Sequence, residues 1–287
     1  MLGRLGMDAG SLMGVEIAPD SVRIVQLQRR NGRCKVAAWV HEPYEPYTGS
    51  DWASDPARVV AALRRAYKRS GSRQRRVAVA LPANQVICKS CQLPAGQREA
   101  DMEAQLLAEA DRLFPFPLED LALDFQVLGP SEAQAGCLEV MVAACRERSL
   151  EPVEALIAAA GLHLEAIEVD SIALQRMLPQ SNPAARALLR LEAQGATLHC
   201  WRQGVPVQRR ELHFEQMPGQ LQALLSDETQ LDGLLVASSS VIEPGWLEGL
   251  SAQMQLPCRR LPVVAGLEPG EGGMLLACAL SLGGLRP

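Results

Sequence analysis

The sequence predicts an α/β fold of two successive lobes, with a small α+β unit inserted into the first lobe. Three observations lead to this prediction. The chain has 287 residues, more than a single hydrophobic core usually holds. Each half opens with β-rich runs and then alternates helix with strand. Residues 86–147 interrupt that alternation with a strand, helix, strand, strand pattern of their own.

The first lobe is expected to begin with hairpins. Residues 14–28 contain two β-rich runs around a Pro-Asp-Ser turn, and a third run at 34–40 follows an Asn-Gly dipeptide, a strong hairpin signal. A helix is expected between Asp55, a typical N-cap residue, and Gly71, which suits the left-handed position after a helix. The continuous apolar run 77–81 indicates a strand buried on both faces.

The inserted unit is predicted to contain one helix and three strands. Strands are expected at 86–93, 121–128 and 137–145. The helix between the first two should end near Phe114, because Pro115 disfavours helical geometry in the residue before it.

The chain then returns to helix and strand alternation. A helix at 152–160, a strand at 166–169 and a short helix at 172–178 complete the first lobe, and the turn cluster at 181–183 marks a lobe boundary. We therefore divide the chain into a first lobe, an inserted unit and an abbreviated second lobe, with these bounds: 13–85 plus 148–182, 86–147, and 183–287. The second lobe is expected to hold strands at 187–191, 197–202, 206–212, 234–237 and 260–264, and helices at 219–225, 246–254 and 273–282.

Composition excludes several classes of protein. With 28 basic and 33 acidic residues the formal charge is −5, and 48% of residues are apolar, so the chain is neither disordered nor a polybasic nucleic-acid-coating protein. Eight scattered cysteines are typical of a reducing compartment. The N-terminus has no secretory signal pattern and no apolar run reaches membrane-spanning length. We expect a cytoplasmic protein, and we expect any association with a membrane to come through a partner.

A resemblance to a known family rests on the inserted unit. Residues 113–129, with their Phe-Pro-Phe-Pro run, closely resemble the signature stretch of PilM, the cytoplasmic family of type IV pilus assembly. The resemblance covers roughly residues 13–178. The chain resembles PilM more than it resembles FtsA, a related family that shares the inserted unit. Three further segments also resemble PilM: 77–82, 92–94 and 154–170. The family implies a duplicated, ribonuclease H-like fold of the actin-like ATPase superfamily.

The resemblance also indicates where a nucleotide would bind. In the superfamily, two hairpin turns approach the phosphates through small residues, while an Asp positions Mg²⁺. The first turn of the family begins Gly-x-Asp-x-Gly followed by Ser or Thr. In this chain Glu16 replaces the Asp, Ala18 replaces the second Gly, Pro19 removes a backbone donor, and Ser21 follows.

The second turn and the adenosine position depart from the family pattern as well. Arg190 stands where the second turn has its acid, and Glu192 places a negative charge near the phosphates. Ser238 and Ser239 stand where the family has a Gly-Gly pair. These departures from the family pattern imply weak or no binding of ATP and Mg²⁺, no catalytic residue, and a pseudo-ATPase.

The expected role is a scaffold. In the family, the groove between the first lobe and the inserted unit captures the N-terminal cytoplasmic tail of an inner-membrane PilN-like protein, which leads indirectly to the PilO/PilP alignment complex and the pilus motor ATPases. A strand edge can hold such a tail by main-chain pairing. The residues we assign to partner binding are Phe114, Phe116, Glu119 and Asp120. Phe114 and Phe116 can equally belong to the core.

Several alternatives stay open. The main one is a functional actin-like ATPase of the pilus or competence machinery, and a scaffold could serve motility, DNA uptake or secretion. Cys88 and Cys91 have the spacing of a zinc half-site but no second pair, so no metal is expected. The seven basic residues between Arg64 and Arg76 are expected to be a solvated helix end, with contact to anionic lipid as the alternative; direct nucleic-acid binding is not expected.

Overall fold

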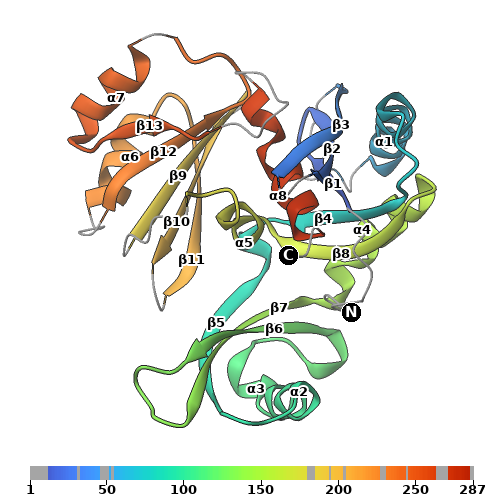
Figure 1. The fold of residues 1–287 in the computed structure, drawn as a ribbon, viewed down its shortest axis with the longest axis vertical. Helices are drawn as coiled ribbons and strands as arrows, with labels where there is room; N and C mark the ends of the chain where they lie inside the picture. Colours follow the sequence, from blue (N-terminus) through green and yellow to red (C-terminus); the bar gives the residue numbers. More distant parts are fainter. Residues whose placement is uncertain are drawn as a thin grey trace.

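The computed structural model describes residues 12–30, 33–45, 52, 55–179, 185–193, 195–202, 205–226, 231–243, 245–262 and 271–284. The chain forms two lobes beside each other and a smaller unit below them (Figure 1). Each of the three parts is built on its own β-sheet. The predicted α/β fold with two lobes is confirmed.

The sheet of the first lobe has five strands in the order β3-β2-β1-β4-β8. Their bounds are β1 Met13–Ile17, β2 Ser21–Arg30, β3 Arg33–Pro43, β4 Arg76–Leu81 and β8 His163–Val169. The first three strands are antiparallel neighbours, as the hairpin signals predict, and β4 and β8 add in parallel. Helices α1 (Pro56–Ser70) and α4 (Glu151–Ala159) share a core with one face of this sheet.

Helix α1 begins and ends where the sequence predicts. The Asp55 carboxylate accepts a hydrogen bond from the backbone N–H of Arg58 at 3.3 Å, and Pro56 occupies the first turn. Gly71 follows the helix with φ of 63°, a left-handed conformation that glycine adopts without a steric penalty. Local capping chemistry is thus sufficient to fix this element.

The inserted unit is a three-stranded antiparallel sheet, β5-β7-β6, covered on one face by two short helices (Figure 1). Its elements are β5 Ile87–Pro94, α2 Glu99–Ala108, α3 Ala110–Leu113, β6 Leu121–Pro130 and β7 Cys137–Arg146. The single predicted helix is therefore two, and the second ends at Leu113. Phe114 is extended, as the following Pro115 requires.

The second lobe repeats the sheet of the first. Its order is β11-β10-β9-β12-β13, so in both lobes the third, second, first, fourth and fifth strands are neighbours in that order. The strands are β9 Ala185–Glu192, β10 Gly195–Arg202, β11 Val205–Leu212, β12 Leu231–Ser238 and β13 Cys258–Arg260, with helices α6 Met217–Ser226 and α7 Trp246–Met254. The shared order is what a duplicated fold produces.

The last helix does not belong to the second lobe alone. Helix α8 (Leu275–Gly283) is buried along residues 275–281 and packs against β1 and β2 of the first lobe. It shares a core with α5 (Asp170–Gln175) and with residues of β9, β10 and β12 from the second lobe (Figure 1). A helix that is apolar on nearly every side must be buried, and here elements of both lobes bury it. Within the described residues, no helix combines the length and apolar character needed to cross a membrane.

Candidate functional site

The first of the two turns expected to hold phosphate joins β1 to β2. The N–H of Ala18 donates to the carbonyl of Ser21 at 2.9 Å, which closes the turn. The Ser21 hydroxyl is buried and donates to Asp20 at 2.8 Å. Glu16 lies directly across the hairpin from Arg23, so the two side chains leave the same face of the sheet and face the second lobe.

The second turn brings two more charges to the same point. Arg190 and Glu192 are two residues apart on β9 and therefore share a face. One guanidinium nitrogen of Arg190, Nη2, lies 2.7 Å from Glu16 and 2.9 Å from Glu192. Arg23 Nη2 lies 2.8 Å from Glu192, and its Nη1 lies 3.5 Å from Glu16. Glu16, Arg23, Arg190 and Glu192 thus form one interlobe ion cluster.

The interlobe ion cluster is removed from water. Glu16, Arg23 and Arg190 are exposed by 6%, 3% and 7%, and Glu192 is half-buried. Burial by itself would lower the pKa of both arginines, but the carboxylates of Glu16 and Glu192 outweigh it, so both pKa values are raised. Both guanidinium groups therefore stay charged. Asp20 lies 3.8 Å from Nη2 of Arg23 and adds a third carboxylate at the edge of the cluster.

A third segment completes the site. Ser239, after β12, donates its N–H to the carbonyl of Leu191 at 2.9 Å, while the Ser238 hydroxyl accepts from the N–H of Ser240 at 3.1 Å. Gly273 lies against Ser239, because a Cβ on this glycine would come within 3.0 Å of the serine Cβ. The carbonyl of Gly273 accepts from Arg23 at 3.0 Å, which ties the segment before α8 to the ion cluster.

These residues do not fit Mg·ATP. The two carboxylates and two guanidinium groups lie between the two turns at which the sequence analysis placed phosphate. A triphosphate there would meet the negative charges of Glu16 and Glu192, while both cations are already paired. The sequence analysis assigned Glu16, Arg190 and Glu192 to this site, and the structure brings all three together. The sequence analysis did not assign Arg23 to the site. An acid and a base directly across a predicted hairpin, as Glu16 and Arg23 are, would have indicated an ion pair.

A second polar group joins the two lobes beside the start of the inserted unit. Asp170, at the start of α5, accepts from the N–H of Ala83, in the segment that leads into β5, at 2.9 Å. Its other oxygen lies 3.0 Å from Nε of Arg209 on β11. The Ser171 hydroxyl and Nδ1 of His199 are 2.7 Å apart, but both side chains are fully buried, so this pair is structural. Burial, with Arg190 and Arg209 nearby, holds the pKa of His199 well below its usual value.

The residues assigned to partner binding lie on the loop between α3 and β6. Phe114 is 4% exposed and packs in the core of the inserted unit. Phe116 is half-buried, and the Arg146 guanidinium lies over its ring at 5.1 Å from the centroid. Asp120 pairs with Arg146 at 3.0 Å, which lowers the pKa of its carboxyl despite the opposing effect of burial. Glu119 is exposed and makes no ion pair or hydrogen bond within the described residues, so it presents its charge to solvent.

The cysteine pair on β5 is not a metal half-site. Cys88 faces Ala143 and Cys91 faces Val140 across the strand pair, so their side chains point to opposite faces of the sheet. Burial raises the pKa of both thiols, which disfavours the thiolate form. No cluster of three potential metal ligands occurs within the described residues.

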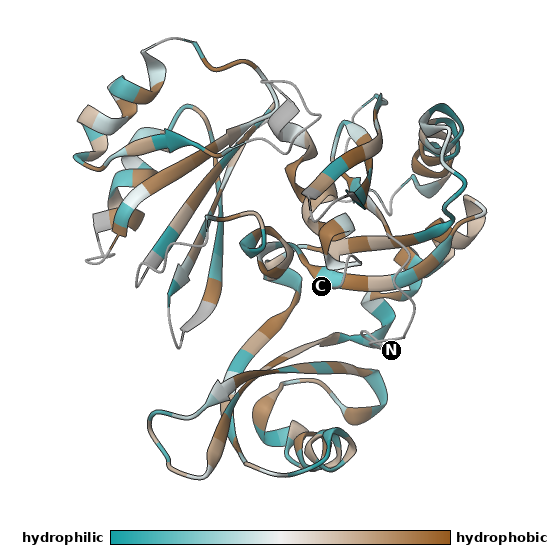
Figure 2. Ribbon diagram, in the orientation of Figure 1, coloured by the Kyte–Doolittle hydropathy of each residue, from teal (hydrophilic) through white to brown (hydrophobic). Residues whose placement is uncertain are grey.

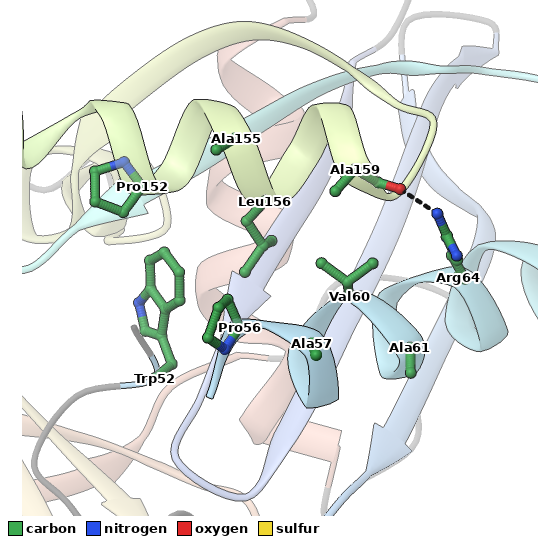
Figure 3. Close-up of a pocket in the computed structure, with 10 residues that line it drawn as sticks. All are labelled: Trp52, Pro56, Ala57, Val60, Ala61, Arg64, Pro152, Ala155, Leu156 and Ala159. Carbon is green, nitrogen blue, oxygen red and sulfur yellow. Dashed lines mark hydrogen bonds between the residues drawn. The ribbon is translucent and has the colours of Figure 1, made fainter. Parts of the chain in front are cut away.

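A separate hollow of about 610 Å³ lies between α1 and α4 (Figure 3). The two helices lie side by side, and small or apolar side chains of both helices line the floor. Figure 3 shows Trp52 at one end and, at the other, Arg64 donating to the carbonyl of Ala159 at 2.6 Å. The hollow is on the far side of α1 and α4 from the interlobe ion cluster, since these helices cover the opposite sheet face from α8.

Comparison with known proteins identifies the family. A family model described as type IV pilus assembly protein PilM matches residues 14–217, which include the first lobe, the inserted unit and the first three strands of the second lobe. The chain belongs to the PilM family. The match extends beyond the resemblance read from the sequence, which ended near residue 178.

Solved structures share the whole fold of this PilM-family chain. A PilM–PilN type IV pilus biogenesis complex superimposes with a TM-score of 0.76 at 19% identity, covering 98% of this chain and 100% of that chain. The cytoplasmic domain of EpsL from Vibrio cholerae, an inner-membrane component of the type II secretion system, has a TM-score of 0.52 at 15% identity, covering 95% and 94%. The ethanolamine utilization protein EutJ from Carboxydothermus hydrogenoformans has a TM-score of 0.52 at 11% identity, covering 96% and 90%. The actin-like fold expected from the sequence is thus confirmed.

Proposed function

We propose that this protein is a scaffold of type IV pilus assembly that binds the N-terminal cytoplasmic tail of a PilN-like inner-membrane protein and does not need ATP to do so. The observation that carries the proposal is the family match over residues 14–217, supported by the full-length likeness to a PilM–PilN complex. The protein would be held at the membrane through this tail, and through it would be linked to the remaining alignment proteins and the motor ATPases.

The groove between the first lobe and the inserted unit is the tail site that the fold supports best. Helices α2 and α3 cover one face of the β5-β7-β6 sheet, and the other face turns toward the first lobe (Figure 1). Ala122 and Cys145 on that face pack into the core of the first lobe, which fixes the unit beside it. Further along the strands, the same face is only partly covered.

This partly covered part of the face offers both apolar and polar side chains to a bound peptide. Met141 is half-buried in the middle strand, with exposed Ser90 and Gln126 directly beside it on the two neighbouring strands. Asp124 lies on the same face, and burial raises the pKa of its carboxyl. Strand β6 is an edge strand, so its outer backbone groups are available for pairing with an extended tail.

Binding of the tail tests the proposal directly. We expect a synthetic peptide of the PilN-like tail encoded beside this protein to bind the full chain in calorimetry, with equal affinity with and without Mg·ATP. Ser90→Arg and Gln126→Arg should each weaken binding at least about tenfold, because a long charged side chain fills the groove at an exposed position where it costs little stability. Ala104→Arg, exposed on α2 of the opposite face, is the matched control and should bind normally. The proposal is contradicted if the wild-type chain does not bind the peptide, or if Ala104→Arg weakens binding as much as Ser90→Arg and Gln126→Arg do.

Glu119 tests whether the acidic rim takes part. Glu119→Lys should leave the Tm unchanged, because the side chain is exposed and makes no ion pair within the described residues. Asp120→Lys is not an equivalent test, since it would face Arg146 and Arg148 and disturb the loop itself. If Glu119→Lys weakens peptide binding while the Tm holds, the rim contacts the tail. If Glu119→Lys leaves peptide binding unchanged, the strand face alone recognises the tail.

The competing function is an active actin-like ATPase, which the fold itself favours. We expect no measurable heat of Mg·ATP binding and a Tm shift below about 1 °C at millimolar ATP, because the nucleotide would have to separate the buried pairs of the interlobe ion cluster. A Mg-dependent micromolar site, or an ATPase rate that Glu16→Gln abolishes, would establish the enzyme instead.

A further inference from the structure

The end of α1 and the segment after it carry seven basic residues, and only some of them are neutralised. Arg65 and Arg69 both pair with Glu42 of β3. Arg76 makes two contacts with Glu165 of β8, at 2.8 and 3.0 Å. These three cations are held by two carboxylates of the first lobe, so together they leave one positive charge beside those of the unpaired residues.

The other four cations, Arg64, Lys68, Arg73 and Arg75, are exposed. Arg64 and Arg75 donate to backbone carbonyls at and just after the end of α4, at 2.6 and 3.5 Å. The partial negative charge at this helix C-terminus stabilises both cations. Within the described part of the chain, none of the four has a carboxylate within 4 Å. We call these four residues the basic end of the first lobe.

A strand of the hairpin adds a further cation. The Ser72 hydroxyl, in the middle of this segment, donates to the side chain of Gln26 on β2 at 2.7 Å. Gln28 is two residues further along β2 and pairs with exposed Lys35 of β3. The positive charge therefore comes from the end of a helix, a loop and a strand that meet at one place, although the whole chain has a net charge of −5.

The opposite end of the molecule is acidic. Exposed carboxylates follow α2 and α3 of the inserted unit, at Glu99, Glu103, Glu109 and Asp111. Helix α1 lies at the upper right of Figure 1 and α2 and α3 lie at the bottom, and α1 is largely hydrophilic in Figure 2. The basic end of the first lobe and these carboxylates lie on separate parts of the molecule, so an anionic surface would attract the first and repel the second.

We propose that the basic end of the first lobe binds directly to anionic phospholipid, and so sets how the protein lies on the membrane. The choice of a membrane as the partner rests on the proposed function, in which the tail of a membrane protein keeps the chain beside a bilayer. A second, weak contact is then effective because the tail supplies a high local concentration. The inserted unit, with its acidic helices, points away from the lipid.

The arrangement of charge matches a lipid surface better than a nucleic acid. The cations are long side chains on three segments around one end, without a groove that tracks a phosphate backbone. Tyr67 packs against the core of the first lobe, and Trp39 of β3 is 40% exposed, so these segments offer a single exposed Trp ring and not the row of rings on which successive bases stack. Each Lys or Arg near an anionic leaflet strengthens binding by roughly fivefold, and salt weakens it.

Vesicle sedimentation of the full chain without the tail peptide tests this proposal. We expect binding to vesicles of phosphatidylcholine with 40% phosphatidylglycerol at low salt, about tenfold or more above binding to pure phosphatidylcholine, and loss of binding in 0.5 M salt. The triple variant Lys68→Glu, Arg73→Glu, Arg75→Glu should reduce binding on the order of 100-fold. It should keep the wild-type affinity for the tail peptide, since the groove is elsewhere.

A matched triple variant separates the surface from the net charge. Arg112→Glu, Arg259→Glu and Arg260→Glu make the same charge change at exposed positions on α3 and β13, and this variant should still bind. Equal losses in both triples, no sedimentation with anionic vesicles, or tighter binding of a short DNA duplex than of vesicles would each overturn the proposal. A chain that binds the tail peptide but no vesicles would leave the proposed function intact and refute this inference alone.

Discussion

Replacing Arg190 with methionine is expected to destabilise the protein by about 3–5 kcal/mol, because it leaves Glu16 and Glu192 as buried or half-buried carboxylates with one shared cation, Arg23. A loss of that size lowers the Tm by roughly 10 °C for a chain of this length. Thermal and urea denaturation measure the effect. Arg259→Met, at an exposed arginine of β13, is the matched control and should change the Tm little.

The double variant Arg190→Met with Glu16→Gln identifies the cause. Removing the partner carboxylate takes away the unpaired charge, so the double variant should be more stable than Arg190→Met alone by about 1–3 kcal/mol. Strictly additive losses would mean that Arg190 acts through packing and not through Glu16. A Tm unchanged by Arg190→Met would mean that the interlobe ion cluster does not hold the lobes together.

The interlobe ion cluster also changes the meaning of the altered nucleotide turns. Taken one at a time, Glu16, Arg190 and Glu192 look like a site that has lost its function. Taken together they are complementary, since a base on one turn meets an acid on the other at 2.7 Å. In this chain, side chains of both lobes form the bridge between the two turns. This is the physical reason to expect tail binding that does not respond to ATP.

Much of the fold could be predicted because its signals are local. The Asp55 cap, the glycine after α1 and the proline after Phe114 each fix an element within a few residues, and each is present in the structure. The alternation of hairpins, helices and strands was sufficient for the two-lobed class. The break between α2 and α3 at Glu109 was missed, because no glycine or proline marks it.

The features that the sequence did not reveal depend on contacts between distant residues. Arg23 and Glu192 are 169 positions apart, and nothing local to either predicts that they meet. The enclosure of α8 by both lobes is equally non-local. Its uniformly apolar sequence indicated burial but not which sheet would cover it. One local feature pointed to the ion cluster: Glu16 and Arg23, an acid and a base, lie directly across the β1–β2 hairpin.

Gly14 shows how tightly that last helix is bound. Strand β1 crosses α8 at this glycine, and a Cβ there would overlap the carbonyl of Ala277 and come within 2.8 Å of the backbone nitrogen of Ser281. The obstacles are backbone atoms of a buried helix, which cannot move aside as a side chain would. Gly14 therefore has a packing role at the start of the turn that the family uses for phosphate.

We expect Gly14→Ala to cost about 3 kcal/mol or more, because a single methyl group must push α8 away from the sheet and loosen the core shared by both lobes. Soluble yield and urea denaturation measure the loss. Gly249→Ala in α7 is the control: no atom lies within 4 Å of the added methyl, so the same substitution should stabilise that helix by about 0.5–1 kcal/mol. If Gly14→Ala is instead as stable as the wild type, β1 and α8 do not cross as closely as the structure has them, and the lobes must be joined in another way.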